Sequence, residues 1–262
     1  MSQTEPGASI KTIDILSTKY ELSEKSKDHL GNLLRFRVKI LADDSSSMNT
    51  KSDAQGYPTR FHELKDGVEL IRDIVVSVTN KPIDIYFLNR ENRENVTSAE
   101  DVEQLFREAP NGHTHLITRV SQILSRIPDN EETLLIIATD GEPNDGTVAG
   151  LKQVLQAKPD YVYVSFLACT DEDNVMEMLN DIDNTVKNVD VTDDYRNEKK
   201  QILAVQGNSF PFSRGDWAMK LMLGAVIPYY DKLDEGNAIV KQYHYIIFYV
   251  IILAILIKIA ML

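Results

Sequence analysis

The chain has 262 residues, of which 43% are hydrophobic and 26% are charged. These values are ordinary for globular proteins and exclude a disordered, collagen-like or wholly membrane-embedded chain. Its 28 basic and 40 acidic residues give a formal net charge of −12, which argues against nucleic acid as a partner because an acidic surface repels phosphates. The single cysteine, Cys169, cannot form an internal disulfide, so a disulfide-rich secreted miniprotein is excluded as well.

The first 30 residues are polar and partly charged, and they begin with neither a basic leader nor an apolar signal region. We treat 1–30 as an N-terminal extension and 31–230 as one domain. Apolar runs of strand length, bounded by turn residues, then alternate with segments of helical periodicity. The predicted strands are 36–42, 83–88, 133–138 and 161–168, with 187–191 as a weaker last strand and 94–97 as a short edge strand.

Between the strands, apolar residues recur at intervals of three and four, which is the period of an amphipathic helix. Helices are predicted at 61–78, 116–127, 175–182 and 216–227, and the last carries Lys220 within an otherwise apolar segment that we assign to the soluble core. Strands that are apolar on both faces and separated by amphipathic helices predict an α/β fold. Its expected form is a doubly wound, Rossmann-like, mostly parallel sheet flanked by helices.

The last residues, 243–262, form an apolar run that contains one charge, Lys258. A helix of this length crosses a hydrocarbon core of about 30 Å, so we expect a single-pass transmembrane helix here and a juxtamembrane tether at 231–242. A buried core helix is the alternative interpretation. An anchor this near the end leaves the ribosome only when synthesis ends, so we expect a tail-anchored protein whose soluble domain faces the cytosol.

Polar side chains follow two of the predicted strands and precede one predicted helix. Asp43-Asp44-Ser45-Ser46-Ser47 follows strand 36–42, Thr139-Asp140-Gly141 follows strand 133–138, and Thr114 precedes helix 116–127. Loops at the carboxyl edge of a parallel sheet can converge on one point. Oxygen-only side chains suit a hard cation, Mg²⁺ by default, with Mn²⁺ and Ca²⁺ as alternatives. The candidate metal residues are Asp43, Ser45, Ser47, Thr114 and Asp140.

Hydroxyl ligands carry no charge, so a cation held mainly by Ser45, Ser47 and Thr114 would keep much of its positive charge and one open coordination position. A carboxylate from another molecule is the natural ligand for that position. The pattern therefore favours the capture of a partner's Asp or Glu over a closed structural ion.

The succession Asp43-x-Ser45-x-Ser47, Thr114 and Asp140 resembles the metal-ion-dependent adhesion site of von Willebrand factor type A domains. The resemblance covers roughly residues 35–230. It implies a doubly wound sheet with one short antiparallel edge strand. It also implies that the three hydroxyls are direct ligands, while the two aspartates act through water or support the ligands.

The chain departs from the family pattern at positions that leave these ligands intact. Ser46 stands where the family commonly has glycine, and His115 where it often has proline. No acidic pair follows Ser47, so the adjacent second metal site of integrin-type members is not supported. Asp44 has no role in the family pattern, and we expect a solvated or loop-capping residue.

Several other patterns have ordinary structural interpretations. His113 and His115 flank the threonine but lack the further ligands of a zinc site. The acid-rich segment 171–194 is expected to be a helix with a solvated outer face, with a calcium site or a dock for a basic partner as the alternatives. Trp217, Met219 and Met222 are expected in the core.

We therefore predict a membrane-anchored, non-enzymatic binding module that recruits a protein partner through a divalent cation. A metal-dependent hydrolase is the first alternative, but the sequence has neither Gly-x-x-x-x-Gly-Lys nor Gly-x-Gly-x-x-Gly to hold a phosphate. A structural membrane protein of an organelle or virion, with a non-essential metal site, is the second.

Overall fold

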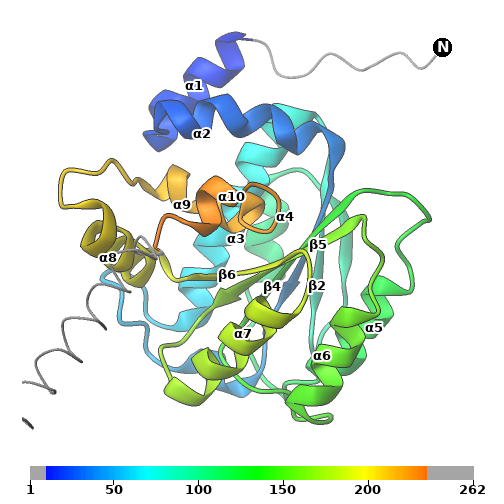
Figure 1. Cartoon of the computed structure of the whole chain (residues 1–262). Coiled ribbons are helices and arrows are strands. Elements are labelled where there is room, and N and C mark those ends of the chain that lie inside the picture. The colour runs from blue at the N-terminus through cyan, green and yellow to red at the C-terminus, as the bar shows by residue number, and fades with distance from the viewer. Residues whose placement is uncertain (1–9, 235–262) are drawn as a thin grey trace, which may run out of the picture.

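The computed structural model describes residues 10–234, which form a six-stranded sheet with helices on both faces (Figure 1). The strand order is β3-β2-β1-β4-β5-β6, and only the β2–β3 pair is antiparallel. The mostly parallel α/β sheet predicted from the sequence is confirmed, including its antiparallel edge strand. The strands are β1 (Arg37–Ala42), β2 (Ile83–Phe87), β3 (Arg93–Val96), β4 (Thr133–Thr139), β5 (Val162–Ala168) and β6 (Val189–Asp193).

Each face of the sheet has its own apolar core, because side chains of a strand alternate between the two faces. In β1, Val38, Ile40 and Ala42 join one core, and Leu41 joins the other. The first core is covered by α1 (Ile10–Tyr20), α3 (Arg60–Thr79), α4 (Ala99–Leu105), α8 (Tyr195–Gln206) and α9 (Arg214–Leu223), and the second by α5 (Leu116–Leu124), α6 (Val148–Gln156) and α7 (Asp173–Thr185) (Figure 1).

The predicted helices 61–78, 116–127 and 175–182 correspond to α3, α5 and α7. The predicted helix 216–227 is shorter: α9 ends at Leu223, and a separate short helix, α10 (Pro228–Asp231), follows. Proline at its first position starts α10, because proline lacks an amide hydrogen and fits the first turn of a helix. Helices α4, α6 and α8 were not predicted, and each buries only one or two apolar side chains.

The packed core begins well before residue 31, in contrast to the extension predicted for residues 1–30. Helix α1 and the short α2 (Glu24–His29) lie against the domain, with Leu16, Leu22 and Leu30 at 3%, 6% and 0% exposure. Ser23 donates through its amide and its hydroxyl to Asp216 at 3.0 and 2.7 Å. These sparse leucines, set among polar residues, pack against α3 and α9, so residues 10–30 belong to the domain.

Helix α9 is buried on nearly all sides, and it fixes the end of β6. Its Trp217 donates an indole hydrogen bond to the Asp193 carbonyl at 2.9 Å, and Met219 and Met222 lie in the core as predicted. Lys220 is 1% exposed and pairs with Glu198 at 3.5 Å and Asp234 at 3.7 Å. Burial alone would lower the pKa of Lys220, but the charges of Asp190 and Glu198 outweigh it and raise that pKa.

Within residues 10–234, no helix combines the length and the apolar character that crossing a bilayer requires. The predicted anchor at 243–262 and residues 235–242 of the predicted tether lie outside the described residues.

The place of α1 in the core gives a stability test with a matched control on the same helix. Leu16→Ala should lower the free energy of unfolding by about 2–5 kcal/mol, because it removes a buried side chain and leaves a cavity. Ile15, the adjacent residue, is 57% exposed, so Ile15→Ala should change that free energy by less than about 0.5 kcal/mol. Urea denaturation of the full chain measures both; equal, small effects would mean that α1 is a detached extension.

Candidate metal centre

The predicted site residues gather where the strand order reverses, at the carboxyl ends of β1 and β4. These strands pair in parallel through the whole of β1, and the Asp43 amide continues the pairing by donating to the Ala138 carbonyl at 2.9 Å. The loop after β1 and the loop that begins at Asp140 therefore leave the sheet side by side. A parallel sheet commonly binds ligands at such a point, because the loops on either side diverge and leave a crevice.

Asp43 is fully buried and holds the first loop in shape. One carboxylate oxygen accepts from the Ser45 amide at 2.8 Å, and the other accepts from the Thr139 hydroxyl at 2.7 Å. Burial raises the pKa of Asp43 to about 6, and the nearby charge of Asp140 adds to the rise, while the hydrogen bonds from Ser45 and Thr139 oppose it. A cation at this point would stabilise the ionised form of Asp43.

The next three oxygens form a short chain of hydrogen bonds. The hydroxyls of Ser45 and Ser47 lie 3.0 Å apart, and Ser47 donates to an Asp140 carboxylate oxygen at 2.7 Å. Adjacent ligands of an octahedral Mg²⁺, with bonds of about 2.1 Å, lie roughly 3 Å apart. The side-chain spacing therefore fits neighbouring positions around one small cation.

Thr114 lies beside these residues, on the loop before α5. Its amide donates to Asn144 Oδ1 at 2.9 Å, and the Asn144 amide donates back to the Thr114 carbonyl at 2.8 Å. A methyl group added to Gly141 would approach the Thr114 hydroxyl to 3.8 Å. The Thr114 hydroxyl therefore lies near the loop that carries Asp140, while hydrogen bonds join the other four predicted residues to one another.

Exposure within the cluster differs between the two serines. Asp43, Ser45, Thr114 and Asp140 are buried, whereas Ser47 is exposed. The cluster is therefore accessible to solvent on the Ser47 side.

Arg60, at the start of α3, is a site residue that the sequence analysis missed. Its guanidinium pairs with the second carboxylate oxygen of Asp140 at 2.9 Å and lies 3.6 Å from Glu172. The Asp140 side chain has no exposure to water, and that of Arg60 has 13%, so this pair supplies the positive charge that a buried carboxylate requires. No motif identifies Arg60, because a single arginine in the first turn of a helix has no distinctive spacing.

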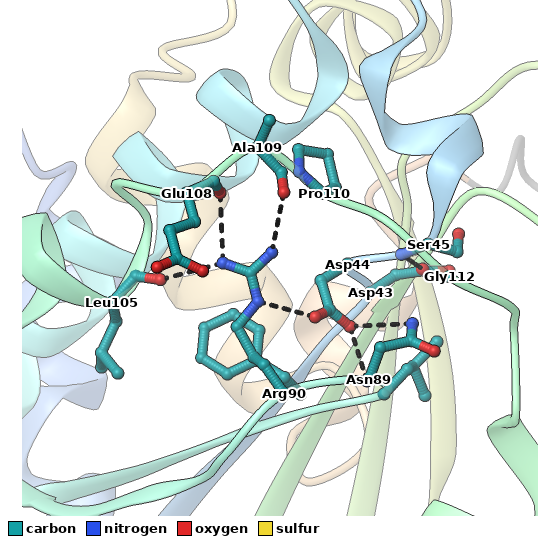
Figure 2. Close-up of polar contacts among 12 residues, drawn as sticks. Asp43, Asp44, Ser45, Asn89, Arg90, Leu105, Glu108, Ala109, Pro110 and Gly112 are labelled. Atoms are coloured by element: carbon teal, nitrogen blue, oxygen red, sulfur yellow. Dashed lines mark hydrogen bonds and ion pairs between the residues drawn. The ribbon is translucent and has the colours of Figure 1, made fainter.

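Asp44 is not solvated, which was one of the two expectations for it. Its side chain is 1% exposed and pairs with Arg90 at 2.7 Å (Figure 2). Its capping role is present, since it accepts from the Asn89 amide at 2.8 Å. The other polar neighbours, His113 and His115, contact each other with ring centroids 5.8 Å apart. Across residues 10–234, no three His, Cys, Asp or Glu side chains gather closely enough to hold a metal ion.

Comparison with known proteins gives similarity to solved structures alone. No family model matches the chain, and no curated protein matches it. Proximal thread matrix protein 1 of the mussel byssus is 17% identical over 66% of this chain and 47% of its own, with a TM-score of 0.43. Manganese-loaded TRAP protein of Plasmodium vivax is 15% identical over 64% of this chain and 72% of its own, with a TM-score of 0.46.

A third solved structure, a von Willebrand factor type A protein of Catenulispora acidiphila, is 14% identical over 71% of this chain, with a TM-score of 0.46. The match spans 43% of the Catenulispora chain. This chain therefore covers less than half the length of both the Catenulispora and the mussel proteins. With TM-scores below 0.5, these similarities do not decide the family.

Proposed function

We propose that residues 31–230, together with the packed residues before them, form a von Willebrand factor type A domain with a working metal-ion-dependent adhesion site. The observation that carries the proposal is the meeting of Ser45, Ser47 and Asp140, from two separate loops, at oxygen spacings of 3.0 and 2.7 Å. The strand order, with its reversal between β1 and β4 and its antiparallel edge strand, supports the same assignment.

The chain's own residues divide the work of holding a cation. Ser45, Ser47 and Thr114 would bind the cation through their hydroxyl oxygens. Asp43 and Asp140 would supply negative charge, either by supporting these ligands from behind or by reaching the cation through a water molecule. Mg²⁺ is the proposed ion, with Mn²⁺ and Ca²⁺ as alternatives. When bound, the ion would supply a coordination position for an oxygen of another molecule.

The partner of this site would be a protein that presents an Asp or Glu side chain. Three uncharged ligands leave the cation with enough positive charge to attract a carboxylate, and the exposed Ser47 leaves that side accessible. Arg60 limits the negative charge of Asp140 through its ion pair. We assign the domain to binding and assign it no chemical turnover.

The proposal also includes attachment to a membrane through residues 243–262. Of the tether predicted at 231–242, residues 231–234 belong to the domain, since Asp231 ends α10, Leu233 is buried and Asp234 pairs with Lys220, so the proposed tether is 235–242. The apolar run of the sequence supports this attachment, because it is long enough to span a bilayer and contains one charge. The domain would then be held at a membrane surface on the cytosolic side.

Cation binding is tested by calorimetry on the full chain. We expect Mg²⁺ or Mn²⁺ to bind the wild type at one site, and we expect Ser47→Ala and Asp140→Ala to abolish that binding because each removes an oxygen of the cluster. Ser125→Ala is the matched control, since the Ser125 side chain is exposed and donates to the Gln122 carbonyl, just after the end of α5 that lies away from Thr114. Unchanged affinity in Ser47→Ala and Asp140→Ala would refute the site.

Partner capture from native membranes, with and without EDTA, separates this function from its alternatives. A partner that is lost with EDTA and in Asp140→Ala supports the adhesion site. Assembly that is indifferent to EDTA would instead support a structural membrane protein, and metal-dependent turnover of a phosphoester or peptide would support a hydrolase.

Orientation is tested by the sequon Asn95-Val96-Thr97. Asn95 lies in β3 with its side chain exposed, so a glycosyltransferase would reach it if the domain entered the secretory lumen. We expect mass spectrometry of the chain from eukaryotic cells to find Asn95 unmodified. A chain engineered with an added sequon that is known to face the cytosol is the comparison, and that sequon should be unmodified as well. Glycan on Asn95 would reverse the proposed orientation.

A further inference from the structure

The buried Asp44 side chain connects the loop after β1 with the segment that leads to Thr114, through Asn89 and Arg90 (Figure 2). We call Asp44, Asn89 and Arg90 the Asp44 network. Asp44 accepts from Arg90 Nε at 2.7 Å with one oxygen, and from the Asn89 amide and side chain at 2.8 and 3.1 Å with the other. Both of its carboxylate oxygens are therefore used within the protein.

Arg90 directs the rest of its guanidinium to the backbone at the end of α4 and just after it. Its Nη1 donates to the carbonyls of Leu105 and Glu108 at 3.3 and 3.1 Å, and its Nη2 donates to Ala109 at 3.3 Å (Figure 2). The guanidinium also lies over the rings of Phe61 and Phe87, at 5.3 and 5.1 Å from their centroids. A single planar group thus fixes three carbonyls of residues 105–109 relative to Asp44, which a lysine could not do.

Asn89 holds the same segment nearer to Thr114. Its side chain donates to the His113 carbonyl at 2.9 Å and accepts from the His113 amide at 3.1 Å. Gly112 has a φ of +124°, and a Cβ there would lie 2.4 Å from Asn89 Oδ1, so the backbone is pressed against this side chain. The residue immediately before Thr114 is therefore bound on both its amide and its carbonyl.

We propose that the Asp44 network positions Thr114 as the third hydroxyl ligand of the metal site, so that Asp44, Asn89 and Arg90 are positioning residues for cation binding. This inference rests on the proposed adhesion site. Asp44 adjoins Asp43 in sequence, and its partners grip the loop of Thr114 over residues 105–113, so it sets the distance between the first two hydroxyls and the third. Residues that orient metal ligands from behind typically change metal affinity by about 10- to 100-fold when they are replaced.

The test measures Mn²⁺ affinity by calorimetry, with urea unfolding of each variant as the record that it is folded at the assay temperature. Asp44→Asn and Arg90→Lys should each weaken Mn²⁺ binding by roughly 10- to 100-fold. The two residues act through one ion pair, so their effects should not add. The double variant should bind Mn²⁺ about as tightly as whichever single variant has the lower Mn²⁺ affinity. A variant that is only destabilised would keep the wild-type Mn²⁺ affinity under conditions where urea unfolding shows that it is folded, so a loss of affinity in a folded variant reports the positioning of Thr114. If Asp44→Asn does not fold, Arg90→Lys, which keeps the charge, carries the test alone.

The matched controls are Asp101→Asn and Arg93→Lys, which change a second Asp–Arg pair, at 3.1 Å, whose side chains are 24% and 55% exposed. These should leave Mn²⁺ affinity unchanged. Unchanged affinity in Asp44→Asn and Arg90→Lys, or an equal loss in the controls, would overturn the positioning role while the adhesion site stands. A wild type that binds no Mn²⁺ would overturn both.

Discussion

The site depends on the burial of two like charges at the ends of adjacent parallel strands. Asp43 and Asp140 are 0% and 3% exposed, and the charge of Asp140 helps to raise the pKa of Asp43. Carboxylates removed from water are stable only with donors or positive charge around them. The Ser45 amide, the Thr139 hydroxyl and Arg60 supply part of that compensation. A divalent cation among the hydroxyls would supply the remainder, which links the architecture of the loops to the proposed binding.

The sheet makes this arrangement possible because its strand order reverses between β1 and β4. The two strands deliver Asp43 and Asp140 to the same edge, and the loops that follow diverge to opposite faces, where α3 and α6 begin. Helix α3 contributes Arg60 from one face, and the loop before α5 contributes Thr114 from the other. The Asp44 network ties the loop that carries Thr114 to the end of β1.

The strands could be predicted from the sequence because their apolar runs are short, branched and bounded by turn residues, as in 133–138 for β4. Long helices such as α3 were predicted for a similar reason, since many apolar residues keep one period. Short helices such as α6 bury two side chains, which is too few to establish a period. Leu16 and Leu22 gave no signal of a core segment, because the surfaces that bury them come from α3 and α9, far along the chain.

The five candidate ligands could be predicted because their residue types and their places after strands are properties of the sequence alone. Arg60 and Arg90, the partners of Asp140 and Asp44, could not be predicted, because the fold determines which charged residues pair. Asp140 and Arg60 are 80 residues apart in the sequence, and Asp44 and Arg90 are 46 apart. Of the two expectations for Asp44, a solvated or a loop-capping residue, the solvated one fails for the same reason, since an aspartate in a loop is normally exposed unless a distant arginine covers it.

The central claim is that hydroxyls from separate loops share one cation. Anomalous diffraction from crystals of the full chain grown with Mn²⁺ tests it most directly. We expect one strong manganese peak within about 2.2 Å of the hydroxyl oxygens of Ser45, Ser47 and Thr114. Crystals that contain Mn²⁺ but show no peak among these oxygens, or show it bound elsewhere on the domain, would contradict the account.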